Sequence, residues 1–200
     1  SLLLFAWRAP KIGLGGKFDL LSRETLLLFN NVLLSVASAS VFIGTLYPLF
    51  MDALGFGKLS VGPPYFEAVF VPLMVPMVLL MGLGPLARWK QFDLKELMQR
   101  VRWAFVIALL AALLLPLVMG KWTPLIALGL FLAFWIITSV ALSLRERLTG
   151  RGNFIQRLVG QSLSYYGMQL AHLGVAVFII GVAMVKGYET ERDVRMNVGD

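Results

Sequence analysis

Five stretches of mostly apolar residues, each about 20 residues long, dominate the chain and are separated by short segments that hold most of its charges. An α-helix rises 1.5 Å per residue, so about 20 apolar residues match the ~30 Å hydrocarbon core of a bilayer. A lone span in lipid must satisfy its backbone polar groups internally, which a helix does. We therefore predict an all-α fold, a polytopic bundle of transmembrane helices. The spans are expected at about residues 26–50, 67–87, 103–119, 123–144 and 163–186.

The overall composition agrees with this fold class. The chain is 58% hydrophobic and 14% charged, whereas soluble domains are about a quarter charged. The net charge is +7, and the charged residues lie between the apolar stretches. This placement is typical of the basic loops of a membrane protein rather than of a nucleic-acid-binding surface. Cysteine is absent, so disulfides and thiolate metal sites are excluded.

The basic residues alternate between the two sides of the predicted membrane. Each of the five spans is preceded by one connection, and in chain order these five connections hold four, one, five, one and four Lys or Arg residues. Because cytoplasmic loops are enriched in these residues, the first, third and fifth connections are predicted to be cytoplasmic. The tail after residue 186 then lies outside, in the periplasm if this is a bacterial inner-membrane protein. We expect a transmembrane domain over residues 1–187, the start of a periplasmic segment over 188–200, and an internal piece of a longer protein.

Two further patterns leave alternatives open. Residues 153–164 are amphipathic, so they form either an interfacial helix before the fifth span or part of one long, tilted helix. Polar side chains share one face of the first span, where a seam against neighbouring helices is favoured over a transport path. These are Asn31, Ser35, Ser38 and Thr45.

His172, the only histidine, lies inside the fifth span, roughly 13 Å from its cytoplasmic start. Polar groups at such depth face a bundle interior or a cavity. The imidazole could bond a neighbouring helix, relay protons, or bind a metal or haem. Small residues at helical spacing nearby, Gly167, Ala171 and Gly174, would allow a helix or a flat cofactor to approach closely.

Catalytic constellations are absent from the sequence. The one histidine lies in the membrane, so no Ser–His–Asp set can form, and no intramembrane carboxylate pair occurs. Glu67 and Asp52 are predicted to be solvated. No catalytic residue is expected within this chain, and no metal site is expected apart from one to which His172 would contribute.

Several runs, in order over nearly the whole chain, resemble one family, the CcmF/NrfE-type cytochrome c haem lyases. They are SLLLFAWRA, SRETLLLFNNVLL, GTLYPL, VGPPYF, PLMVP, GLGPLARW, YYGMQLAHLGV and ERDVRM. The resemblance implies a polytopic membrane protein that helps attach haem covalently to the CxxCH motif of apocytochrome c. It also implies haem delivery by the chaperone CcmE, cooperation with the thiol component CcmH, and a membrane b-type haem that reduces the incoming haem, with quinol as electron source.

The resemblance carries one residue role onto this sequence. In the run from Gly167 to Gly174, His172 stands where the family has an axial ligand of the membrane b-haem. Its second axial ligand and the Trp-rich haem-handling segment are expected outside this chain. The expected haem-pocket lining is Gly167, Met168, Ala171 and Gly174. Candidates for a quinol pocket, chosen for polarity and proximity, are Tyr165, Tyr166 and Gln169.

Two other functions remain as alternatives to the haem lyase. A transporter or channel would use the polar stripe of the first span and the prolines of the second. A purely structural membrane subunit would tolerate replacement of His172 by glutamine.

Overall fold

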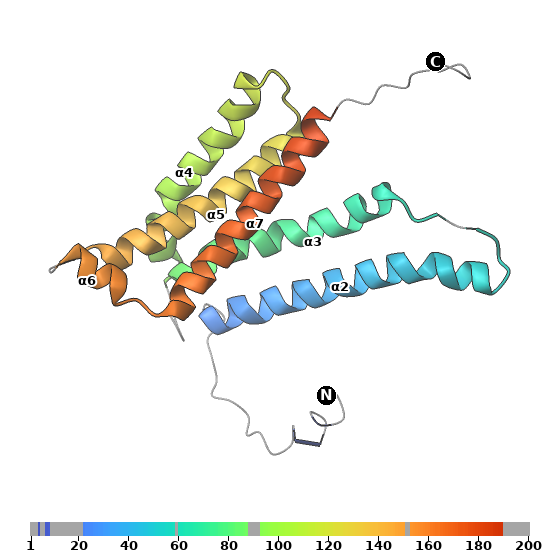
Figure 1. Ribbon diagram of the computed structural model, residues 1–200, viewed down its shortest axis with the longest axis horizontal. Helices are drawn as coiled ribbons and strands as arrows, with labels where there is room; N and C mark the ends of the chain where they lie inside the picture. Colours follow the sequence, from blue (N-terminus) through green and yellow to red (C-terminus); the bar gives the residue numbers. More distant parts are fainter. Residues whose placement is uncertain are drawn as a thin grey trace, which may run out of the picture.

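The computed structural model describes residues 4, 7–8, 22–58, 60–87, 93–150 and 153–189. Over these residues the fold is helical, and five helices are long and apolar enough to cross a membrane (Figure 1). This confirms the predicted all-α, polytopic membrane fold. The elements are α2 (Arg23–Ala53), α3 (Pro63–Leu83), the 3-10 turn η2 (Gly84–Leu86), α4 (Leu94–Val118), α5 (Pro124–Leu148), α6 (Phe154–Val159) and α7 (Leu163–Tyr188).

Side-chain caps define where four of the long helices begin. The side-chain oxygens of Ser22, Asp93, Thr123 and Ser162 each accept a hydrogen bond from a backbone N–H in the first turn of α2, α4, α5 and α7. These bonds satisfy donors that a helix start leaves without an intrahelical partner. Between α4 and α5 the chain reverses at Gly120, whose φ of +78° favours glycine.

The long helices run alternately up and down, with α5 at the centre (Figure 1). Helix α5 packs against α4, α7 and α3, while α2 packs mainly on α3. The central helix is also the most buried. In the most apolar 18-residue stretch of each helix, 44% of the residues are buried in α5 and 6% in α2. The starts of α2, α4 and α7 and the end of α5 share one end of the bundle, which we call the basic end. It carries Arg23, Arg100, Arg102, Arg145, Arg147 and Arg157.

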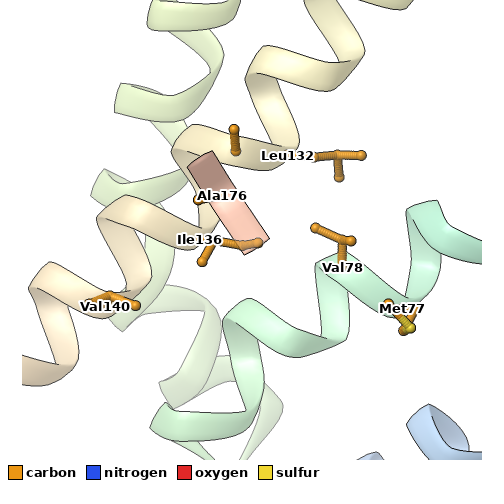
Figure 2. Packing of buried hydrophobic residues seen from close by; sticks show 7 residues of the cluster. Met77, Val78, Leu132, Ile136, Val140 and Ala176 are labelled. Carbon is orange, nitrogen blue, oxygen red and sulfur yellow. The ribbon is translucent and has the colours of Figure 1, made fainter. Parts of the chain in front are cut away.

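The main core cluster joins α3, α5 and α7. Val78 of α3 points toward Leu132 and Ile136 of α5, beside Ala176 of α7 (Figure 2). Ile136 and Ala176 have no exposed surface. The small Ala176 side chain lets α7 approach α5 closely, as is common in membrane bundles. This contact fixes the rotation of α7 and therefore the direction in which its polar side chains point.

Helix α4 begins nine residues earlier than the predicted span at residue 103, so Lys95 and Arg100 lie within the helix. Its first turns are amphipathic rather than apolar, which a hydropathy pattern of membrane length does not detect. Leu97 and Val101 are buried, and they belong to a cluster with Leu86 and Trp135. This tertiary packing extends the helix beyond the apolar stretch.

The amphipathic segment 153–164 does not continue into the fifth span as one helix. Helix α6 ends at Val159, Gly160 caps it, and α7 starts anew at Leu163. The alternative of one long, tilted helix is therefore wrong. Phe154, Ile155 and Val159 of α6 are exposed, and an interfacial position remains a prediction.

The predicted polar seam of α2 does not lie in its contact with α3. The side chains of Asn31, Ser35, Ser38 and Thr45 are exposed, and the hydroxyls of Ser35 and Thr45 donate to carbonyls of their own helix. The contact uses small residues of α2 instead. Ala37 and Gly44 are buried, and a Cβ on Gly44 would meet the ring of Tyr65.

The predicted domain boundary falls at the edge of the described chain. Of the segment 188–200, the structure describes residues 188 and 189. The expectation that this segment starts a periplasmic domain lies mostly outside the described residues and stays a prediction.

Candidate functional site

His172 lies in the third turn of α7, and its side chain is half-buried. Its Nδ1 is 2.7 Å from the backbone carbonyl oxygen of Met168, one turn earlier. A carbonyl oxygen accepts only, so Nδ1 carries the hydrogen in this bond. The neutral ring then has its basic lone pair on Nε2, and the Met168 bond restrains the orientation of the ring. This tautomer is the one in which a histidine presents Nε2 as a ligand.

Of the four residues expected to line a haem pocket, Met168 contacts His172, through its backbone carbonyl. At about 100° per residue, Gly174 lies about 200° around the helix from His172 and Gly167 about 140°. Both glycines are exposed, and a Cβ on either would meet no heavy atom of the described chain within 4 Å. Ala171 is also exposed, about 100° from His172. The small-residue face and the imidazole therefore belong to different sides of α7.

The close approach of α7 to α5 uses small residues that the sequence did not single out. Ala183 would be 3.0 Å from a Cβ placed on Gly129, and a Cβ on Gly187 would clash with Ile126. Ala176, Ala183 and Gly187 lie on the side of α7 that faces α5. Small residues at helical spacing therefore occur on two faces of α7, and one of them is already occupied by α5.

A buried polar cluster lies one to two turns before His172, between α5 and α7. The hydroxyls of Tyr165 and Ser143 are 3.2 Å apart, and Gln169 Nε2 donates to Ser143 Oγ at 3.1 Å. The Arg147 guanidinium lies 4.0 Å from the centroid of the Tyr165 ring. The side chains of Tyr165 and Gln169 are both 5% exposed, so they face α5 rather than the surface.

The three residues proposed for a quinol pocket do not all come together. Tyr165 and Gln169 share the cluster with Ser143. Tyr166 points elsewhere, and its hydroxyl donates to the carbonyl of Leu158 in α6. Sequence reasoning missed Ser143, because a serine in an apolar helix gives no signal of which neighbour it faces.

At the other end of the bundle, the structure pairs Glu67 of α3 with Lys186 of α7, with 2.7 Å between the charged atoms. Glu67 was predicted to be solvated. It is half-exposed, but it also forms this ion pair. The pair borders an apolar cavity of about 260 Å³ between α3, α5 and α7. Among its lining side chains are Phe70, Met74, Leu128, Leu132, Val175 and Ile179.

In the described ranges, no three His, Cys, Asp or Glu side chains come together as metal ligands do. A metal group bound at His172 would therefore take a single ligand of these types from the described residues. The fold and this side chain define a class, a polytopic helical membrane protein with an imidazole available deep within a span.

The comparisons with known proteins narrow this class to one family. Over its whole length the chain is 44% identical to the cytochrome c-type biogenesis protein CcmF of Escherichia coli (strain K12), covering 30% of that protein. It is 38% identical, also over the whole chain, to CcmF of Pseudomonas aeruginosa, covering 30% of it. It is 39% identical over 98% of the chain to CycK of Rhizobium meliloti (strain 1021), again covering 30%. The chain belongs to the CcmF family of cytochrome c-type biogenesis proteins.

A solved structure agrees with this family. The structure described as "Cytochrome c Heme Lyase CcmF" matches with a TM-score of 0.62 and 27% sequence identity, over 84% of this chain and 26% of that one. No model of a protein family matches the chain. The chain spans about 30% of the length of the curated relatives it matches.

Proposed function

We propose that this chain forms part of the membrane domain of a cytochrome c haem lyase, which helps attach haem covalently to the CxxCH motif of apocytochrome c. Membership of the CcmF family and the description of the matching structure as a haem lyase support this function. The proposal includes the partners that the family resemblance implies, the haem chaperone CcmE, the thiol component CcmH and a quinol. It also includes the bacterial inner membrane, with the basic end facing the cytoplasm, because basic side chains gather at that end.

Within this function, His172 is proposed as one axial ligand of a membrane b-type haem. The hydrogen bond from Nδ1 to the Met168 carbonyl is the observation that carries this assignment. It leaves Nε2 as the basic nitrogen, and the side chain is half-buried rather than packed on all sides. A backbone carbonyl behind a ligating imidazole fixes the tautomer and the orientation of the ring. The residue present therefore fits the group, and its second axial ligand would come from outside this chain.

The chain's own residues would hold and orient the cofactor, and a bound haem would supply one-electron chemistry at its iron. His172 would provide the ligand nitrogen, and Met168 would keep its ring in one orientation. The apolar packing of Ile136 and Ala176 on the next turn holds α7 against α5. Because α5 contacts both α3 and α4, this packing joins the turn that follows His172 to the centre of the bundle.

The test is optical and uses the purified full-length protein. The His172→Gly variant should lose the b-type absorbance, and added imidazole should restore it by entering the space of the missing ring. Leu170→Ala, at a side chain that is 72% exposed on the same helix, is the matched control and should keep the spectrum. An unchanged spectrum in His172→Gly would refute the ligand assignment. Full activity of His172→Gln with no b-type absorbance in the wild type would favour a purely structural role.

A further inference from the structure

A line of polar side chains runs along the α5–α7 contact from the basic end toward the depth of His172. It consists of Arg147, Tyr165, Ser143, Gln169 and Ser139, which we call the polar column. Arg147 is exposed and donates to Gln161, whereas the exposed fractions of the other four lie between 1% and 5%. Four buried polar side chains along one contact between two membrane-spanning helices are costly unless their hydrogen bonds are satisfied.

Two atoms at the inner end of the polar column are not satisfied. Gln169 Oε1 and Ser139 Oγ are fully buried, and neither has a hydrogen-bond partner among the described residues. If the Gln169 amide were rotated by 180°, Nε2 would take the place of Oε1, and one buried amide atom would still have no partner. Buried polar atoms are nearly always bonded to protein or to ordered water. An internal water commonly bonds to two to four otherwise unsatisfied groups, so a water is the kind of partner that would satisfy atoms such as these.

The register of the two helices places this site at the depth of His172. Ser143 bonds both Tyr165 and Gln169, so it lies level with the point of α7 midway between these two residues, near residue 167. Helices α5 and α7 run in opposite directions (Figure 1). Ser139, one turn back along α5, is therefore level with about residue 171 of α7, within about one residue rise of His172. Gln169 lies one turn or less from the same level.

We propose that the polar column is a water and proton access path, which leads from the basic end to an internal water held by Gln169 and Ser139 at the depth of His172. Its outer end lies at Arg147, where the guanidinium covers the Tyr165 ring. A role for this path at His172 rests on the proposed function. If His172 holds a cofactor whose charge changes, protons that reach the site would stabilise the new charge. The existence of the path does not depend on that function.

The chemical groups of the polar column suit such a path. The hydroxyls of Tyr165 and Ser143 and the internal water each accept one proton while they release another. The Gln169 amide and the Arg147 guanidinium do not relay protons, so the internal water itself must bond Ser143 Oγ for the path to be continuous. Each oxygen that takes up a proton from one neighbour then releases one to the next, so no group changes its net charge. The Gln169 amide holds the water through its oxygen while its nitrogen donates to Ser143.

The first test is an experimental structure of the full-length protein at a resolution that shows ordered water. We expect a water within about 2.7–3.2 Å of both Gln169 Oε1 and Ser139 Oγ. In the Ser139→Ala variant this water should be lost or displaced. Direct packing of the two side chains against apolar groups in the wild type, with no water between them, would overturn the proposal.

The second test measures access from bulk water. In full-length protein, the Gln169→Glu substitution introduces a carboxyl group with nearly the same shape, whose infrared carbonyl band shifts when its proton is replaced by deuterium. We expect exchange within seconds of transfer to D₂O. Adding Tyr165→Phe should slow the exchange at least tenfold, because it removes the outermost hydroxyl of the path.

The matched control adds Tyr166→Phe to Gln169→Glu. The Tyr166 hydroxyl bonds Leu158 and lies outside the polar column, so its loss should leave the exchange rate unchanged. Equal rates in all three proteins, or no exchange over hours in Gln169→Glu, would overturn the proposal. Neither measurement requires bound haem. A protein without b-type absorbance would therefore contradict the proposed function while leaving the path to be judged by its own two tests.

Discussion

Glu67 Oε1 and Lys186 Nζ lie 2.7 Å apart although the two residues are separated by 119 positions in the sequence. Glu67 belongs to the second turn of α3, and Lys186 to the last turn of α7. The pair thus connects two helices that enter the bundle far apart in the chain. It lies at the end opposite the basic end, beside the apolar cavity between α3, α5 and α7.

This ion pair should make a small, salt-dependent contribution to stability. Glu67→Gln and Lys186→Met should each lower the apparent Tm slightly, because both side chains are about half exposed and screened by solvent. The charge reversal, Glu67→Lys with Lys186→Glu, should recover most of the loss. The measurement is thermal unfolding of the purified full-length protein at low and high salt. Additive losses in the reversed pair would contradict an interaction between the two residues.

Among the tryptophans that the structure describes, Trp135 should be the one on which packing of the bundle depends most. Its indole Nε1 donates to the backbone carbonyl of Leu79 in α3 at 3.1 Å, and its side chain is 3% exposed. Trp135→Phe removes this donor and part of the buried ring, so we expect a loss of about 1–3 kcal/mol. Trp122→Phe, at a residue that is 46% exposed, is the control and should change stability little. Equal effects in denaturant titrations would show that the Leu79 contact is unimportant.

The contact between α3 and α5 also depends on the absence of a side chain at Gly82. A Cβ at this position would clash with the Trp135 indole. Gly82→Val should therefore destabilise the protein by about 1–3 kcal/mol through overpacking. Gly181→Val makes the same replacement in a helix where a Cβ would meet no described atom within 4 Å, so it should be tolerated. Comparable yield and Tm for the two variants would argue against the tight α3–α5 contact.

The break between α6 and α7 depends on the cap at Ser162. Its side-chain oxygen accepts a hydrogen bond from the backbone N–H of Tyr165 at 3.3 Å. Ser162→Ala should cost about 1 kcal/mol and loosen the first turn of α7. Hydrogen exchange of the amides in residues 163–166 should accelerate as a result. Ser164→Ala, two residues later and exposed, should leave these rates unchanged, and identical exchange in both variants would refute the cap.

The expected roles around His172 show where sequence patterns reach their limit. A rotation of about 100° per residue already places Gly167 and Gly174 on another side of α7 than the imidazole, and only the structure shows that no described atom would meet a Cβ on either glycine. Periodicity shows which residues share a helix face. It does not show which neighbour that face meets, because this depends on packing by residues such as Ala176 that look ordinary in the sequence.

The sequence by itself determined the five spans, their alternating direction and the family. Hydropathy over 20 residues and loop charge are local properties, so they remain visible in any arrangement of the helices. Only the tertiary structure decided that α4 begins at Leu94 and that Glu67 meets Lys186. It also decided that Ser143 joins Tyr165 to Gln169. Such pairings depend on the rotation and register of packed helices, which arise from many small contacts between residues distant in sequence.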